Sequence, residues 1–118
     1  MSWPRVEINA ELPVRVTELE NHDPVLLVFG AGWSLNLACP WTGVITARNT
    51  SWADDDVEDR AGDLVGTELV SVDDGAPGEI DFRFTDAVLH VRPDSDFDPW
   101  VLRLPSVIAV GTWTGGPT

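Results

Sequence analysis

Apolar and polar residues alternate with a period of two along most of this chain, and clusters of Gly, Pro and Asp separate the alternating segments. This pattern is typical of short antiparallel strands, whose successive side chains point to opposite faces of a sheet. We therefore expect a mainly β fold, an antiparallel sandwich or barrel-like sheet of about eight strands. A length of 118 residues fits a single domain spanning residues 1–118.

The two halves of the chain carry the same order of segments. In the first half, a strand, a polar turn, a hairpin and a Pro-Trp pair follow one another at residues 12–19, 20–24, 25–39 and 40–41. In the second half, the same order occurs at residues 67–72, 73–78, 79–92 and 99–100. We interpret this recurrence, at a spacing of about 55 residues, as an internal repeat of one β-meander, at about 10–48 and 64–108.

The hairpin of the second half has one apolar and one polar face. We take Asp86-Ala87 as its two-residue turn, which fixes the partner of every strand residue. The pairs on the apolar face are then Phe84 with Leu89 and Phe82 with Val91. The pairs on the polar face are Arg83 with His90 and Asp81 with Arg92, which suits contact with water.

The hairpin of the first half carries apolar residues on both of its faces. A Gly30-Ala31-Gly32 loop predicts three inward pairs, which are Phe29 with Trp33, Leu27 with Leu35 and Val25 with Leu37. Leu26 and Val28 then lie on the opposite face, beside Ser34 and Asn36. We expect another element or a second subunit to cover this face, so a homodimer formed through Leu26 and Val28 is one hypothesis.

The segment at about 52–64 between the two halves is predicted to be one short helix or an acidic loop. Thr50 or Ser51 is the expected N-cap, and Asp54-Asp55-Asp56 would place negative charge in the first turn. Apolar residues recur there at helical spacing, at Val57, Ala61 and Leu64 or Val65. The Gly-rich and Thr-rich end of the chain, residues 111–118, is expected to be a flexible tail.

Charge argues against two classes of partner. Twenty acidic residues stand against seven basic ones, all Arg, for a formal net charge of −13. Nucleic-acid binding needs clustered Lys and Arg to neutralise phosphates, and an anionic membrane would repel this chain. The acidic residues gather in the predicted turns and linker, where they either attract a basic protein or only keep the chain soluble.

Cysteine use and the N-terminus indicate a cytoplasmic protein. A single cysteine, Cys39, permits neither an intramolecular disulfide nor a cysteine metal cage, and suits a reducing compartment. The first residues lack the profile of a signal peptide. Residues 24–47 carry no formal charge and are numerous enough to cross a bilayer, but their Gly and Pro residues and the alternation at 33–37 favour strands.

No arrangement of residues predicts catalysis or a cofactor. His22 and His90 are far apart in the sequence, and no nucleophile elbow or phosphate loop is present. The run at 94–98 begins like an EF-hand loop, but Pro99 and Pro105 hold positions that need Gly and Glu. Asp94, Asp96 and Asp98 therefore form either a divalent-ion site of another kind or a solvated acidic turn. We expect neither an enzyme nor a bound cofactor.

Six tryptophans divide into expected core and surface groups. Trp33 and one of Trp41 or Trp100 are expected in the core, whereas Trp3, Trp52 and Trp113 lie near the termini or the linker. Exposed Trp is frequent in protein interfaces. The candidate interaction surface therefore comprises Leu26, Val28, Trp52, Asp54, Asp55, Asp56 and Trp113.

The second half resembles a family of small bacterial β domains of unknown function. The resemblance rests on Phe82-Arg83-Phe84-Thr85-Asp86, on the strand Leu89-His90-Val91-Arg92-Pro93 and on Asp98-Pro99-Trp100. In that family an Asp-Gly pair makes the turn, and Ala87 departs from it. The resemblance implies a β fold and carries over no activity.

Three functions fit these observations. The first is a non-catalytic β domain that acts through protein–protein contact, with itself or with a basic partner. A sharper form is an immunity or antitoxin-like protein that masks a basic toxin such as a nuclease. The third is a binder of small molecules or carbohydrates that uses Trp and carboxylate side chains.

Overall fold

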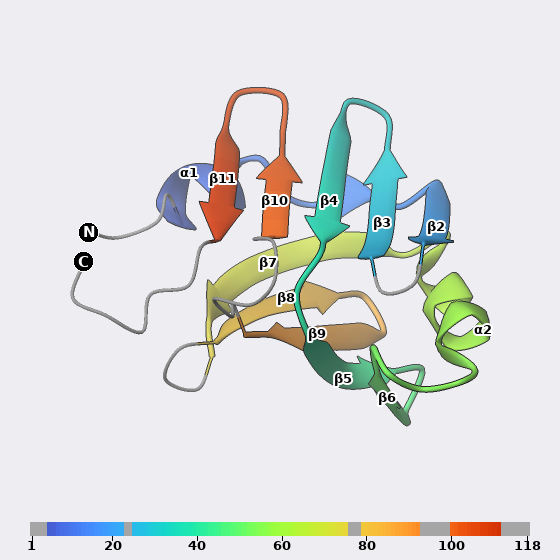
Figure 1. Ribbon diagram of the computed structural model, residues 1–118. Coiled ribbons are helices and arrows are strands. Elements are labelled where there is room, and N and C mark those ends of the chain that lie inside the picture. The colour runs from blue at the N-terminus through green and yellow to red at the C-terminus, as the bar shows by residue number, and fades with distance from the viewer. Residues whose placement is uncertain (1–4, 23–24, 76–78, 93–99, 112–118) are drawn as a thin grey trace.

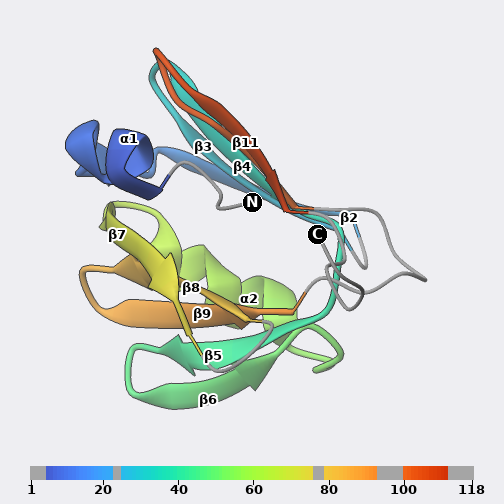
Figure 2. The same ribbon diagram turned by 90° about the vertical axis from the view of Figure 1, so that its left-hand side faces the viewer.

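The chain folds into two antiparallel sheets that lie against each other as the layers of a sandwich (Figures 1 and 2). A computed structural model describes residues 5–22, 25–75, 79–92 and 100–111. These residues form eleven strands and two short α-helices. The predicted mainly β sandwich is confirmed, with more and shorter strands than expected.

The six-stranded sheet has the strand order β1-β7-β8-β9-β5-β6. Its strands are β1 (Val14–Arg15), β7 (Glu68–Asp74), β8 (Ile80–Phe84), β9 (Ala87–Val91), β5 (Trp41–Ile45) and β6 (Arg48–Ser51). The five-stranded sheet has the order β11-β10-β4-β3-β2. Its strands are β11 (Ile108–Gly111), β10 (Trp100–Arg103), β4 (Trp33–Leu37), β3 (Val25–Gly30) and β2 (Glu18–His22).

Two of the predicted segment boundaries are wrong. The strand expected at 12–19 is divided into β1 and β2, which belong to different sheets. The first repeat was expected to end at about residue 48, but strand β6 continues to Ser51 and pairs with β5 through a tight turn at Thr46 and Ala47. Both turn residues have positive φ, of 51° and 65°, as the common two-residue hairpin turn requires.

Each run of three neighbouring strands is followed in the chain by a hairpin that belongs to the other sheet. Strands β2, β3 and β4 are neighbours, and the chain then crosses to the other sheet, where β5 pairs with β9 and β6 follows at the edge. Strands β7, β8 and β9 are likewise neighbours, and the chain then crosses so that β10 pairs with β4 and β11 follows at the edge. Two copies of one meander related by a rotation would have this arrangement, although the duplication itself stays a prediction.

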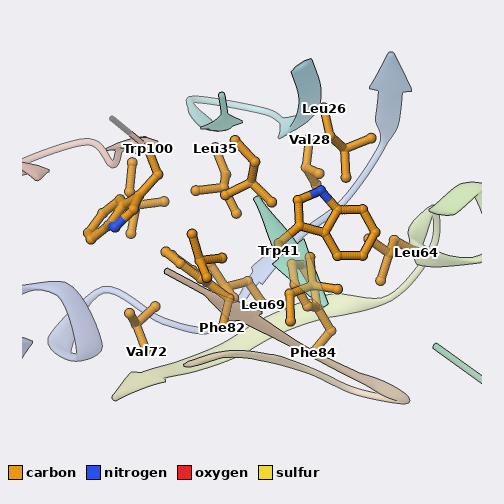
Figure 3. Packing of buried hydrophobic residues seen from close by; sticks show 14 of the residues in the cluster. Leu26, Val28, Leu35, Trp41, Leu64, Leu69, Val72, Phe82, Phe84 and Trp100 are labelled. Atoms are coloured by element: carbon orange, nitrogen blue, oxygen red, sulfur yellow. The ribbon is translucent and has the colours of Figure 1, made fainter. Parts of the chain in front are cut away.

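The core fills the space between the sheets (Figure 3). Trp41 and Trp100 each begin a strand that follows a crossing, and both are buried, with 2% and 1% of their surface exposed. Trp100 packs edge-to-face on Phe82, with 5.1 Å between ring centroids. Trp33 is also buried, and its Nε1 donates to Arg15 O at 2.8 Å. Three tryptophans therefore lie in the core, one more than expected.

The register of the β3–β4 hairpin corrects the prediction for its two faces. Gly30 pairs with Trp33, so the turn is Ala31-Gly32 and every pair moves by one residue. Leu26 and Val28 therefore point into the core and are 1% and 0% exposed. A Cβ at position 30 would overlap Arg15 O, so only glycine permits the close approach that sets this register. The homodimer surface expected at Leu26 and Val28 does not exist.

The register of the β8–β9 hairpin also differs from the prediction, by two residues. Its turn is Thr85-Asp86, because Thr85 N donates to Glu68 O at 3.0 Å and Thr85 Oγ1 accepts from Glu68 N at 3.1 Å. A shift of two residues leaves each side chain on its predicted face but changes its partner. Asp81 therefore lies opposite His90 instead of Arg92.

The two helices close the ends of the sandwich. The sequence did not predict α1 (Arg5–Ala10), which buries Ile8 and uses the Asn9 amide to bind both Val72 N and Val72 O, at 3.0 and 2.8 Å. Helix α2 (Val57–Ala61) continues into a 3-10 turn and lies within the predicted segment. The expected cap is wrong, since Thr50 and Ser51 belong to β6 and Asp56 is the N-cap residue.

Candidate functional site

A row of polar residues crosses the outer face of the six-stranded sheet. Successive cross-strand partners from β7 to β6 form this polar row, which comprises Asp73, Asp81, His90, Thr42 and Ser51. All five residues lie on the same face because each is directly opposite the next in the ladder. The row places an acid, an imidazole and a hydroxyl side by side on neighbouring strands.

Asp81 is the buried member of the polar row. Its side chain is only 8% exposed. The backbone at Gly75 packs against its carboxylate, and a Cβ there would overlap Asp81 Oδ1. Gly75 N donates to Glu79 O at 3.0 Å, which holds the end of β7 and the start of β8 together over the carboxylate. A buried carboxylate needs charged or hydrogen-bonding partners to offset its lost hydration.

Two neighbours supply partners for Asp81. His90 Nδ1 lies 2.6 Å from Asp81 Oδ1, and Arg83 Nη2 lies 3.5 Å from Asp81 Oδ2. The hydrogen bond to Asp81 fixes the orientation of the imidazole ring. Among the described residues, His90 Nε2 has no hydrogen-bond partner. This nitrogen is therefore available to a ligand.

Glu79 adds a second carboxylate to the same place. Its Oε2 lies 3.1 Å from Arg92 Nη2. Ligand atoms of Glu79, Asp81 and His90 all lie within 4.8 Å of one another. Sequence reasoning missed this grouping because it paired Asp81 with Arg92. No pattern within the hairpin marks the turn at Thr85-Asp86, which brings Asp81 opposite His90.

A shallow pocket adjoins the other side of His90. Its volume is about 420 Å³, and it is lined by Thr42, Gly43, Val44, Asn49, Thr50, Ser51, Asp54 and His90. Strands β5 and β6 provide most of the lining, and the loop before α2 provides Asp54. Carboxylate, hydroxyl, amide and imidazole groups all border this pocket, which suits a polar ligand.

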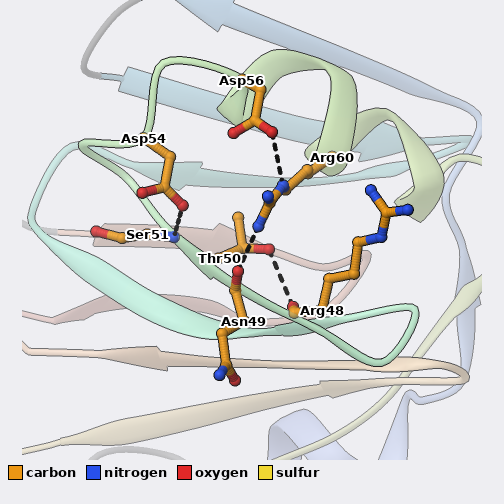
Figure 4. A network of polar contacts seen from close by, with 7 residues as sticks. All are labelled: Arg48, Asn49, Thr50, Ser51, Asp54, Asp56 and Arg60. Atoms are coloured by element: carbon orange, nitrogen blue, oxygen red, sulfur yellow. Dashed lines mark hydrogen bonds and ion pairs between the residues drawn. The ribbon is translucent and has the colours of Figure 1, made fainter.

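Hydrogen bonds hold the α2 segment against β6 at the pocket (Figure 4). Asp54 Oδ2 accepts from Ser51 N at 2.8 Å, and Arg60 Nε donates to Asp56 Oδ2 at 2.9 Å. Arg60 Nη1 also donates to Asn49 O. The wall formed by the loop before α2 is therefore fixed to the sheet by polar contacts.

The arrangement resembles a hydrolytic site only in the types of its residues. Asp81, His90 and Thr42 follow one another in the polar row, as an acid, a base and a hydroxyl do in a catalytic triad. No hydrogen bond joins Thr42 to His90 within the described residues. The geometry thus shows an oriented imidazole without an activated hydroxyl, and the absence of catalysis stays a prediction.

The residues expected to form the interaction surface are dispersed. Leu26 and Val28 are in the core, and Trp52 is half-buried, with its N donating to Trp41 O at 3.1 Å. Asp54 lines the pocket, and exposed Asp55 and Asp56 follow it. Trp113 lies outside the described residues, as do Trp3 and the acidic candidates Asp94, Asp96 and Asp98.

Comparison with known proteins gives no match from which a function could be inferred for this site. No protein-family model matches the chain, and neither a curated protein nor a solved structure matches it. In the part of the chain that the structure describes, no helix is both long and apolar enough to span a membrane. The oriented His90 and the polar pocket beside it are the features on which a function can be argued.

Proposed function

We propose that this protein is a non-catalytic binding domain for a basic protein, and that an Arg or Lys side chain of this partner enters the pocket beside α2. The composition of the pocket lining carries the proposal. Asp54 contributes a carboxylate, Asn49 and three hydroxyl residues contribute oxygen acceptors, and no Arg or Lys lines the pocket. A guanidinium or ammonium group finds its preferred acceptors in such a lining.

The charge around the pocket supports the same partner. Residues 48–63 hold six acidic and two basic residues. One of the basic residues, Arg60, is already paired with Asp56. Exposed Asp55, Glu58 and Asp59 extend the negative surface, which the buried Val57 and Ala61 anchor to the core. A fixed acidic surface of this kind attracts basic proteins over a distance and raises their rate of association.

An immunity or antitoxin-like protein is the sharper form of this proposal. Such a protein would act in the cytoplasm by covering the basic surface of a toxin, for example a nuclease. The strong negative charge and small size support this form. A toxin gene directly beside the gene for this protein would favour it, and the absence of a toxin gene beside every homologous gene would contradict it.

Titration with an arginine-rich peptide tests the proposed surface. The backbone NMR signals of β6 and α2 should shift on binding, and affinity should fall at least about tenfold between low salt and 0.5 M salt. A triple variant, Asp55→Asn, Glu58→Gln and Asp59→Asn, should bind at least about fivefold more weakly.

A matched variant provides the control for net charge. Glu7→Gln, Glu18→Gln and Glu20→Gln remove three exposed charges from α1 and β2. This control should change the peptide affinity by less than about twofold. Equal weakening in both variants would mean that only net charge matters and would contradict a docking surface at α2.

A small polar ligand is the second candidate function, favoured by the volume of the pocket and by the free Nε2 of His90. No Trp lines the pocket, so a sugar would bind there through hydrogen bonds without ring stacking. Ligand-observed NMR with a panel of monosaccharides and small amines would test this function. Binding that His90→Gln abolishes would support it, and no binding at millimolar concentration would exclude it.

A further inference from the structure

We propose that Glu79, Asp81 and His90 bind a divalent transition-metal ion of the Zn²⁺ class. The observation behind this proposal is the approach of two carboxylates and one imidazole, whose ligand atoms lie within 4.8 Å of one another. This site lies on the β8 side of His90, whereas the proposed partner surface lies on the β6 side. The two sites share His90, but the metal proposal does not rest on the basic partner.

The sheet holds the three ligands in place. Asp81 and His90 are direct cross-strand partners, each one residue from the end of its strand, β8 or β9. Glu79 immediately precedes β8, and the bond from Gly75 N fixes its backbone at 3.0 Å. Ligands on paired strands lose little conformational entropy when they bind an ion, because the backbone has already set their spacing.

The balance of charge around Asp81 favours a cation. Asp73 lies directly opposite Asp81 on the same face, and like charges in this position repel. Two arginines now balance the carboxylates, but their side chains are 54% and 63% exposed, at Arg83 and Arg92. Water screens these exposed guanidinium groups, so they offset the charge of the two carboxylates only in part. A divalent ion would neutralise Glu79 and Asp81 directly and release both arginines to water.

The ligand types select the class of metal. One imidazole with two carboxylates suits Zn²⁺ and its neighbours Co²⁺ and Ni²⁺, whereas Ca²⁺ and Mg²⁺ favour sites made of oxygen ligands alone. Metal–ligand bonds of about 2.0–2.2 Å hold neighbouring ligand atoms about 3.3 Å apart. The Nδ1–Oδ1 distance of 2.6 Å therefore has to widen slightly, which small side-chain rotations achieve.

Calorimetric titration with ZnCl₂ tests the site. We expect one Zn²⁺ per chain and no comparable binding of Ca²⁺. His90→Gln and Glu79→Gln should each weaken Zn²⁺ binding at least about tenfold. Arg92→Gln should strengthen it about two- to threefold, because Arg92 competes with the ion for Glu79. Co²⁺ should give a visible absorption band that disappears in His90→Gln.

The matched control is the other histidine of the chain. His22 Nε2 lies 2.8 Å from Glu20 Oε1 in an exposed pair on β2, without a third ligand nearby among the described residues. His22→Gln should leave Zn²⁺ affinity unchanged within about twofold. Equal loss in His22→Gln and His90→Gln, or Zn²⁺ binding weaker than about 1 mM in the unaltered protein, would overturn the site.

Two further measurements separate this proposal from other causes of failure. Far-UV circular dichroism of His90→Gln and Glu79→Gln should match that of the unaltered protein, because both side chains are partly exposed. Glu79→Gln should leave binding of the arginine-rich peptide unchanged. If the unaltered protein binds Zn²⁺ but not the peptide, the partner surface alone is contradicted. If the unaltered protein binds the peptide but not Zn²⁺, the metal site alone is contradicted.

Discussion

The outer faces of the two sheets differ far more than their inner faces do. Both inner faces are apolar and fill one core. Outward positions of the six-stranded sheet form the polar row, which includes a buried carboxylate. Outward positions of the five-stranded sheet carry apolar and polar residues in about equal number. Ile108 and Val110 are exposed there and Leu27, Phe29 and Val101 are half-buried, beside Ser34, Asn36, Arg103 and the Glu18, Glu20 and His22 of β2. Core packing constrains the inner faces alike, so the differences that serve function can collect on the outer faces.

The two histidine–carboxylate pairs show the same contrast on a smaller scale. The distances are similar, 2.8 Å in the Glu20–His22 pair and 2.6 Å in the Asp81–His90 pair. The carboxylates differ, since the Glu20 side chain is 49% exposed and the Asp81 side chain is 8% exposed. Water screens the first pair, and in the second pair it is mostly excluded from the carboxylate. Burial therefore distinguishes the candidate site from an ordinary surface contact.

The largest expected effect concerns the inner and outer faces of β3. Leu26→Ala should lower the free energy of unfolding by about 3 kcal/mol, because it leaves a cavity in the core. Leu27→Ala should cost about 1 kcal/mol, because Leu27 is half-buried on the outer face. Urea denaturation of both variants measures the difference. A larger loss for Leu27→Ala would restore the register expected from the sequence and contradict the structure.

A smaller effect should separate the two histidine pairs. A double-mutant cycle with Asp81→Asn and His90→Gln should give a coupling energy of about 1–2 kcal/mol, because Asp81 is buried. The same cycle with Glu20→Gln and His22→Gln should give less than about 0.5 kcal/mol. Chemical denaturation of each single and double variant supplies the four values of a cycle. Equal coupling in both pairs would show that burial does not distinguish them.

The smallest expected effect is a change of melting temperature, and it concerns two hairpin turns. The β3–β4 turn of the five-stranded sheet has glycine where φ is positive, at Gly32 with φ of 80°. The β5–β6 turn of the six-stranded sheet has Thr46 and Ala47 in such conformations. Ala47→Gly should therefore raise the melting temperature, through a gain of about 0.5–1 kcal/mol. Gly32→Ala should lower it by a similar amount, and a change of the opposite sign in either variant would contradict these backbone angles.

The alternation of residues predicted which segments are strands better than it predicted their registers. Residues 25–29 are all apolar, so a shift of one position leaves apolar residues on both faces and the pattern cannot distinguish the alternatives. The contact of Gly30 and Trp33 with Arg15 O decides the register, and it joins segments distant in the sequence. Helix α1 was missed because it is short and, in the described part of it, buries one large apolar side chain, Ile8.

The sequence could not predict the candidate site, for a related reason. The faces of β8 and β9 were predicted correctly, but the partners on those faces depend on where the turn begins. Thr85 leaves the hairpin to bond with Glu68 of β7, which no pattern within the hairpin reveals. The sequence showed that the segment before α2 is a cluster of acidic residues. It could not show that this segment packs against β6, because the contacts between them form only in the folded chain.

The exchange of hairpins between the sheets has a consequence for how the chain folds. Strand β9 needs β5 from the first half, and β4 needs β10 from the second. Neither half can complete a sheet by itself, so a fragment ending before β7 would expose the edge of β4 and a loose β5–β6 hairpin. Such distant pairings make folding slow and cooperative, and they delay it until nearly the whole chain has left the ribosome.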